Sequence, residues 1–153
     1  MFLARTPIRN LLSTNARFLL ATQARTFATF RKFTEDHEWL EVNTDTNQAK
    51  IGITNHAQSE LGDIVHIDLP SVGDEFSSGD SVGAVESVKT AAEVLAPVDG
   101  EIVGVNEKLS DDPALVNQDA EGDGWIVEVK LNDSSAADGL MTEEEDKEFL
   151  SNL

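Results

Sequence analysis

Lys89 is the residue of this chain with the clearest chemical use. It ends the tetrapeptide Glu86-Ser87-Val88-Lys89, and the sequence has no other lysine between Lys50 and Lys108. A primary amine can carry an acyl group through an amide bond. An attachment lysine must be exposed, rigidly supported and distinct from other lysines, and the isolation of this amine in an acidic sequence meets the last need. The alternative is an ordinary surface lysine, because most lysines are exposed.

Two short apolar runs flank Lys89 and predict a β-hairpin with the lysine at its tip. They cover residues 81–85 and 91–97. The tip contains neither Gly nor Asn-Gly, which is the strongest signal for a tight hairpin turn. We therefore expect the register of this hairpin to depend on the packing of its strands.

The elements that must support this hairpin are mostly short strands. Alternating polar and apolar residues predict strands over 38–42, 49–53, 63–69, 101–105 and 124–131. Turn residues recur about every ten positions, which favours an all-β sandwich or flattened barrel. We expect residues 33–153 to form one such domain.

Helices are expected at the margins of this domain. Thr54 and Asn55 can cap a short helix over 56–61, and Gly62 fits its end. Residues 109–118 are predicted to be an irregular connection. Thr142 and Glu145 have the spacing of a capping box before a C-terminal helix.

The first 32 residues differ in charge from the rest of the chain. They hold all five arginines and no Asp or Glu, and their apolar residues can form one stripe on a helix. This composition is typical of a mitochondrial transit peptide, so we expect 1–32 to be a disordered or weakly helical leader, cleaved within about 25–33. The protein would then reside in the mitochondrial matrix. The alternative is a basic tail that binds anionic surfaces.

Charge also limits the partners of the remaining chain. Residues 33–153 contain five lysines and all 29 acids, a net charge of −24. Such a domain would be repelled by the phosphates of nucleic acid, and it favours partners with basic docking surfaces. Arginines interrupt every apolar run of the leader, so a membrane span is not expected either.

The remaining reactive or bulky side chains have simpler interpretations. The chain has no cysteine, which excludes disulfides and thiolate chemistry. His37, His56 and His66 lack the spacing of metal ligands, so no metal site is expected. Trp39 and Trp125 are predicted to lie in the core.

Several segments also match a known family in order and spacing. They are His37-Glu38-Trp39, Gly52-Ile53-Thr54-Asn55-His56-Ala57-Gln58, Leu61-Gly62-Asp63, Gly83-Ala84-Val85-Glu86-Ser87-Val88-Lys89, Pro113-Ala114-Leu115-Val116-Asn117 and Gly122-Asp123-Gly124-Trp125. On these segments, the stretch from Phe33 to Leu150 resembles the H proteins of the glycine cleavage system. The resemblance implies a lipoyl/biotinyl-like β-sandwich with short peripheral helices and a C-terminal helix. It also implies (R)-lipoate joined to Lys89 by an amide bond.

The resemblance further implies a carrier without catalysis of its own. The arm on Lys89 would receive the aminomethyl group of glycine from a pyridoxal-phosphate glycine decarboxylase, with release of carbon dioxide. It would pass the group to a tetrahydrofolate-dependent aminomethyltransferase, and dihydrolipoamide dehydrogenase would reoxidise the dithiol. Lipoate-attaching enzymes are further expected partners, and the protein is expected to be a monomer. Tethering replaces diffusing encounters with a locally concentrated arm.

The same family shelters the loaded arm in a surface groove. Glu38 and Glu93 match positions that line this groove, where a carboxylate can pair with the charged amine of the arm. Some members have Asp at the position of Glu93, and Asp36 departs from the small polar residue expected there. The alternative is that Glu38 and Glu93 are solvated strand acids.

Other carriers share this kind of hairpin. Biotin carriers place methionine on both sides of the lysine, whereas Val88 and Thr90 flank Lys89. A 2-oxo-acid dehydrogenase acyltransferase needs a further catalytic domain, for which 153 residues leave no room. A structural or lipoate-donor module without glycine turnover stays open as an alternative.

Overall fold

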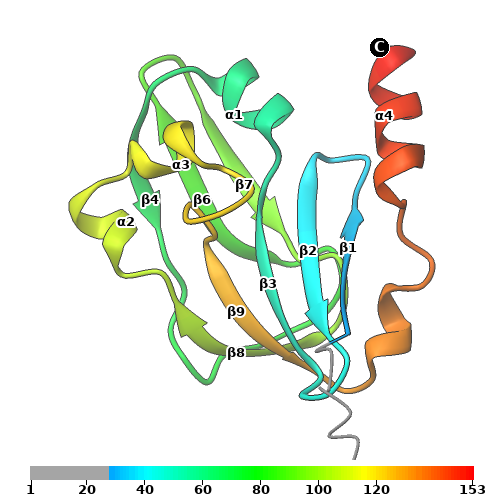
Figure 1. Cartoon of the computed structure of the whole chain (residues 1–153). Coiled ribbons are helices and arrows are strands. Elements are labelled where there is room, and N and C mark those ends of the chain that lie inside the picture. Colours follow the sequence, from blue (N-terminus) through cyan, green and yellow to red (C-terminus); the bar gives the residue numbers. More distant parts are fainter. Residues whose placement is uncertain (1–27) are drawn as a thin grey trace, which may run out of the picture.

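Two antiparallel β-sheets form the body of the protein (Figure 1). In the computed structural model, which describes residues 28–153, the sheets are stacked as a sandwich. The larger sheet contains, in spatial order, β1 (Thr29–Phe33), β2 (Glu38–Asn43), β3 (Gln48–Ile53), β9 (Val127–Leu131), β8 (Gly100–Val105) and β5 (Glu75–Phe76). The smaller sheet contains β4 (Ile64–Asp68), β6 (Ser81–Ser87) and β7 (Ala91–Leu95). This arrangement confirms the predicted all-β sandwich.

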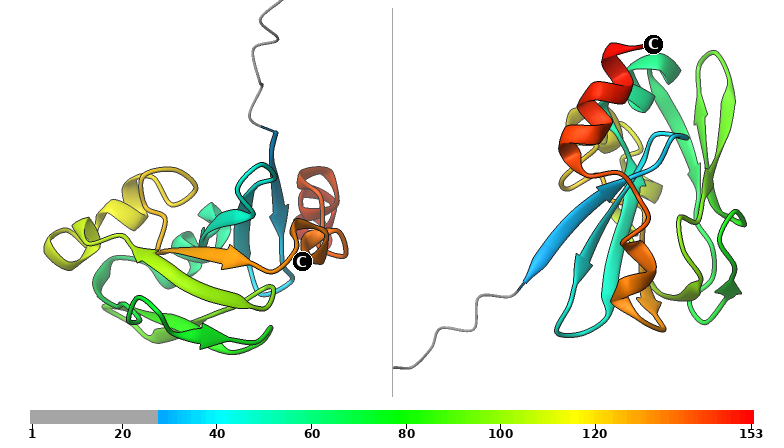
Figure 2. Two further views of the ribbon diagram at one scale, coloured as in Figure 1. Left: turned by 90° about the horizontal axis from the view of Figure 1, so that it is seen from below. Right: turned by 90° about the vertical axis from the view of Figure 1, so that its right-hand side faces the viewer.

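Short helices lie around the sandwich. They are α1 (Asn55–Leu61), α2 (Lys108–Asp111), α3 (Leu115–Gln118), the 3-10 helix η1 (Ser134–Ala137) and α4 (Glu143–Ser151). Figure 2 shows α4 beside β1, on the outside of the larger sheet. The prediction of an irregular connection over 109–118 was wrong, because this region contains the two short helices α2 and α3. Each is about one turn long, and they bury Leu109 and Val116 respectively. Within the described part of the chain, no helix is long and apolar enough to cross a membrane.

The predicted caps of α1 and α4 are confirmed. Thr54 Oγ1 accepts a hydrogen bond of 3.2 Å from the Ala57 N–H, at the start of α1. The N–H of Gly62 donates to the carbonyl oxygen of Gln58, and its φ of 79° is one that glycine adopts without strain. At α4, Thr142 forms a complete capping box that satisfies amides at the helix start.

The first strand begins inside the segment assigned to the leader. β1 pairs with β2 from Thr29 opposite Asn43 to Phe33 opposite Trp39. The Arg31 guanidinium lies 4.6 Å from the centre of the Trp39 ring, so its charge covers an aromatic face of the domain. The folded domain therefore starts at or before Thr29, and not at residue 33. The rest of the predicted transit peptide lies outside the described residues.

The core lies between the two sheets. Most of its aliphatic members come from the facing strands, and Leu109 of α2 joins them. Each such side chain buried in full contributes about 1.5–3 kcal/mol through removal from water. Those with the least exposure include Leu40, Ile51, Val85, Val94 and Ile102.

The two tryptophans occupy different environments. Trp39 is 1% exposed, and its indole N–H donates a hydrogen bond of 2.9 Å to the Ala120 carbonyl. Trp125 is only partly buried, with the Lys50 ammonium 5.1 Å from its ring centre. The prediction of a core residue was therefore right for Trp39 and wrong for Trp125, whose ring is covered by a charged side chain at the surface.

Candidate functional site

Lys89 lies at the exposed tip of the hairpin formed by β6 and β7 (Figure 1). The strands pair from Ser81 opposite Leu95 to Glu86 opposite Ala91, with one register shift near the open end. Val85 and Val94 anchor the hairpin in the core, each with 1% exposure. The predicted hairpin is thus confirmed, and its tip projects beyond the packed part of the smaller sheet.

The hydroxyl of Ser87 braces this tip. Its Oγ accepts hydrogen bonds from the backbone N–H groups of Lys89 and Thr90, at 3.2 and 3.1 Å, and donates to the Thr90 carbonyl. The Ser87 N–H also donates to that carbonyl, at 2.7 Å. The expectation that the hairpin register depends on strand packing alone was therefore incomplete. The Ser87 hydroxyl stabilises the turn through local hydrogen bonds, in a hairpin that lacks Asn-Gly.

The connection between α1 and β4 supports the tip from one side. The Val88 N–H donates a hydrogen bond of 3.0 Å to the Asp63 carbonyl. A Cβ placed on Gly62 would lie 3.1 Å from Lys89 Cε, so the lysine stem runs across the face of this glycine. The tip is braced by its own serine and by a neighbouring turn, and the amine stays exposed.

A groove of about 190 Å³ lies between β2, α1 and the β6–β7 hairpin. Glu38 and Glu93, both predicted from the resemblance, line this same groove, and so do Asp36 and His37. Apolar side chains, including those of Ile53, Leu61, Val85 and Val94, form much of its wall. The structure thus brings Glu38 and Glu93 together at one cavity, although 55 positions separate them in the sequence.

The two glutamates play different parts in this wall. Glu93 is exposed, whereas Glu38 is 3% exposed. Glu38 Oε1 accepts a hydrogen bond of 3.2 Å from the Leu95 N–H, and Oε2 accepts one from the Thr34 hydroxyl. Burial raises the pKa of Glu38, while the bonds from Thr34 and Leu95 partly oppose this rise. Glu38 is therefore not a solvated strand acid, and Glu93 is the carboxylate that faces solvent.

A second polar cluster, not predicted from the sequence, joins α4 to the wall of the groove. The rings of His37 and His56 lie 4.5 Å apart, and His37 also lies 5.9 Å from Phe149 of α4. Burial raises the pKa of Asp146 in α4, and the nearby His37 and His56 oppose this rise. His37 adopts a φ of 68°, which is uncommon outside glycine. No spacing rule in the sequence connects these residues, which meet only after folding.

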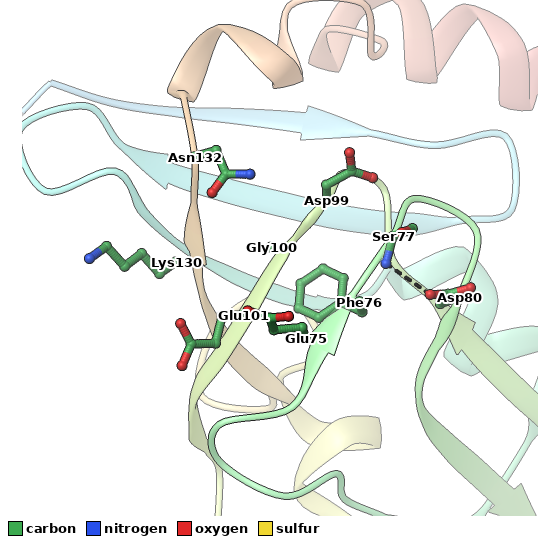
Figure 3. A pocket seen from close by; sticks show the side chains of 9 residues that line it. All are labelled: Glu75, Phe76, Ser77, Asp80, Asp99, Gly100, Glu101, Lys130 and Asn132. Atoms are coloured by element: carbon green, nitrogen blue, oxygen red, sulfur yellow. Dashed lines mark hydrogen bonds between the residues drawn. The ribbon is translucent and has the colours of Figure 1, made fainter.

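A second cavity lies away from the lysine tip, and the described residues hold no cluster suited to a metal ion. Among residues 28–153, no group of three or more His, Cys, Asp or Glu side chains is arranged to hold a metal ion. A cavity of about 490 Å³ lies at the other end of the hairpin, where Asp80 precedes β6 (Figure 3). β6 has seven residues, so about 23 Å of strand separate this cavity from the tip. The lining is Glu75, Phe76, Ser77, Asp80, Asp99, Gly100, Glu101, Lys130 and Asn132.

A two-sheet sandwich that projects one lysine on a braced hairpin has the architecture of a carrier domain. A sequence profile described as glycine cleavage H-protein matches residues 31–153. The glycine cleavage system H protein of Thermotoga maritima is 46% identical over 119 residues, which cover 78% of this chain and 94% of the relative. That of Thermoanaerobacter pseudethanolicus is 52% identical over 118 residues, covering 77% and 91%.

A solved structure agrees with these sequence relatives. The crystal structure of a glycine cleavage system H protein from Mycobacterium marinum matches with a TM-score of 0.70 and 38% identity, covering 80% of this chain and 94% of that one. The chain therefore belongs to the glycine cleavage H-protein family and is a non-catalytic carrier subunit of the glycine cleavage system.

Proposed function

We propose that Lys89 carries (R)-lipoate in amide linkage and serves the three enzymes of glycine cleavage in turn. These are glycine decarboxylase, aminomethyltransferase and dihydrolipoamide dehydrogenase. When bound, lipoate supplies a cyclic disulfide that accepts the aminomethyl group of glycine together with two electrons. The protein itself supplies position and transfer.

One observation carries this proposal: the amine of Lys89 is exposed on a tip whose backbone is fixed. Ser87 and the Asp63 carbonyl hold the residues on either side of the lysine, so the attaching enzyme meets a pre-ordered target. Strands β6 and β7 connect this fixed tip to the core, where Val85 and Val94 are buried. The side chains of Val88 and Thr90 beside the lysine support lipoate as the attached group, since biotin carriers have methionine at both places.

The groove supports a sheltering role for the loaded arm. Glu93 follows Lys89 by four residues, so the chain between them spans at most about 13 Å. A lysine side chain extended by an eight-carbon acyl chain has a similar length, about 15 Å from about twelve bonds. The exposed carboxylate of Glu93 can pair with an ammonium at the end of the arm, while the apolar wall excludes water. Glu38 holds the wall in place through Leu95.

The surface charge supports transient encounters with several partners. The chain has 29 acids and a formal charge of −18, so its field attracts partners with basic docking surfaces. These partners include lipoate-attaching enzymes as well as the three enzymes of the cycle. The proposal takes the carrier to be a monomer, and sedimentation of the purified protein would test this.

We also propose that the protein resides in the mitochondrial matrix. The segment before residue 28 has the composition of a transit peptide, and the family match begins at residue 31. Cleavage on the N-terminal side of Thr29 would leave β1 and its pairing with β2 intact. We therefore place the cleavage in the early part of the range 25–33.

Mass spectrometry of the protein isolated from lipoate-replete cells tests the attachment. We expect one lipoyl adduct, located on Lys89, and its complete loss in Lys89→Arg. Lys108→Arg serves as the control and should keep the adduct. An adduct at another lysine, or none in the unaltered chain, would refute the proposed function.

A further inference from the structure

Asn117 belongs to α3, yet its side chain bonds the turn between α1 and β4. Oδ1 accepts a hydrogen bond of 2.9 Å from the Ile64 N–H. Nδ2 donates two bonds of 2.9 Å, to the Gly62 carbonyl and to Oε1 of Gln58. The backbone N–H of Ile64 can only donate and the Gly62 carbonyl can only accept, so these partners fix the orientation of the amide.

The turn held by Asn117 is the same turn that supports the lysine tip. Asp63 lies between the two residues whose backbones Asn117 binds, and its carbonyl accepts the bond from the Val88 N–H. The Lys89 stem crosses Gly62, the first residue of the turn. A continuous path therefore runs from the Asn117 amide through two backbone groups to the tip.

We propose that Asn117 is a positioning residue for Lys89, which acts by fixing the turn of Gly62, Asp63 and Ile64 beneath the hairpin tip. This inference rests on the proposed function, in which Lys89 is the attachment point. Loss of the amide frees the Asp63 carbonyl to move away from Val88, and the tip then samples more conformations. An attaching enzyme must order those conformations before reaction, which slows attachment.

The role differs from a general contribution to stability. Asn117 is only partly buried, and its bonds go to Gln58 of α1, to the Gly62 carbonyl and to Ile64, the first residue of β4. All three partners lie in or beside the turn beneath the hairpin tip. Asn43 offers a matched comparison, because its Oδ1 accepts bonds from the backbone N–H groups of Asp45 and Thr46 in the turn after β2. That turn belongs to the larger sheet and not to the sheet that carries Lys89.

Amide hydrogen exchange in the full chain tests the first half of the inference. In Asn117→Ala we expect the Val88 and Ile64 amides to exchange about tenfold faster, the change that follows loss of one or two hydrogen bonds, with exchange at Val129 unaltered. In Asn43→Ala the Val88 amide should exchange as in the unaltered chain. Unchanged exchange at Val88 in Asn117→Ala would overturn the inference.

Attachment kinetics test the second half. With a lipoate ligase, free lipoate and ATP, we expect Asn117→Ala to lower kcat/KM for lipoylation of Lys89 several-fold, and Asn43→Ala to leave it unchanged. An equal loss in both variants would show a general folding effect and defeat the inference. Should Asn117→Ala not fold, Asn117→Asp decides: it keeps the acceptor for Ile64 but not the donor to Gly62, so the same faster exchange and slower attachment are expected, and unaltered values would refute the role.

Failure of the inference and failure of the proposed function give different results. An unaltered chain that takes up no lipoyl group contradicts the proposed function and removes any role in attachment. The exchange of Val88 in the same samples still shows whether Asn117 holds the tip. Normal lipoylation of the unaltered chain, with Val88 insensitive to Asn117→Ala, would leave the proposed function standing and reject the positioning role alone.

Discussion

The buried carboxylate of Glu38, on the larger sheet, accepts a hydrogen bond from the backbone N–H of Leu95, on the smaller sheet. This bond crosses the sandwich beside the groove that both sheets line. Glu38 and the Thr34 hydroxyl are also bonded, so both carboxylate oxygens are occupied by the protein itself. The residue therefore holds the wall of the groove in one shape.

Removal of this link should destabilise the protein. We expect Glu38→Ala to lower the free energy of unfolding by about 1–3 kcal/mol, because the Leu95 N–H and the Thr34 hydroxyl lose a buried partner. Glu38→Gln retains an acceptor for Leu95 and should cost less. Denaturant unfolding monitored by tryptophan fluorescence measures both values, and equal stability of Glu38→Ala and the unaltered chain would contradict the structural role.

Comparison of the unaltered chain with Glu38→Gln also tests how stability depends on pH. Burial raises the pKa of Glu38 above its ordinary value of 4.5, so the folded state favours the protonated form. The stability that the folded state gains by favouring protonated Glu38 is complete below pH 4.5. It is lost as pH rises from there through the raised pKa of Glu38 in the folded state. We expect the difference in unfolding free energy between the unaltered chain and Glu38→Gln to fall over this interval. A difference that stays constant or rises would rule out the raised pKa.

The Ser87 hydroxyl should matter for attachment more than for stability. Ser87→Ala removes the acceptor for the Lys89 and Thr90 amides at an exposed tip, so we expect a several-fold loss in the rate of lipoylation and a change in Tm of only a few degrees. Ser87→Thr keeps the hydroxyl and should restore the rate. Ser78→Ala is the matched control, since the Ser78 hydroxyl donates to the Pro97 carbonyl beyond the other end of the hairpin. Equal rates for Ser87→Ala and Ser78→Ala would disprove the bracing role.

Gly52 is required by its neighbour Trp39. The two residues face each other across β2 and β3, and a Cβ on Gly52 would lie 2.7 Å from the indole ring. The ring is fully packed, so we expect Gly52→Ala to lower the free energy of unfolding by about 1–3 kcal/mol. Among the described residues, no heavy atom lies within 4 Å of a Cβ placed on Gly139, so Gly139→Ala should change stability by less than about 0.5 kcal/mol. Thermal unfolding of the two variants compares them directly.

Two N-terminal deletions separate the leader from the fold. Removal of residues 1–27 leaves β1 complete, whereas removal of 1–32 deletes most of β1 and the guanidinium over Trp39. We expect the shorter deletion to keep the full unfolding free energy and the longer one to lower it. Both should fail to enter mitochondria if the leader is a transit peptide. Equal stability of the two proteins would show that β1 is dispensable, and import of either would contradict the transit function.

Local signals in the sequence were sufficient for much of the fold. The caps of α1 at Thr54 and Gly62 and the capping box at Thr142 each depend on residues within one or two helical turns, and the structure agrees at all three. The β6–β7 hairpin follows from two apolar runs around Lys89. Such features need no knowledge of distant parts of the chain.

Features that depend on distant contacts were missed or only partly foreseen. β1 was taken as leader because Arg31 and Lys32 continue the basic composition, although the strand is decided by its pairing with β2. The link between Glu38 and Leu95 joins residues 57 positions apart, and the bond from Asn117 to Ile64 spans 53. Chemistry and spacing could identify Lys89 as a candidate, but the groups that brace it become visible only when the chain is folded.

The distribution of cations gives the hairpin one more property. From residue 51 to residue 107, a stretch that contains the entire smaller sheet, Lys89 is the single Lys or Arg. Acylation converts its ammonium into a neutral amide, so this face would change from mixed charge to wholly anionic in one step. Unmodified and modified protein would then differ in retention on an anion exchanger. A partner with a basic surface would distinguish the acylated protein from the protein with a free Lys89 by electrostatics, before it contacts the arm.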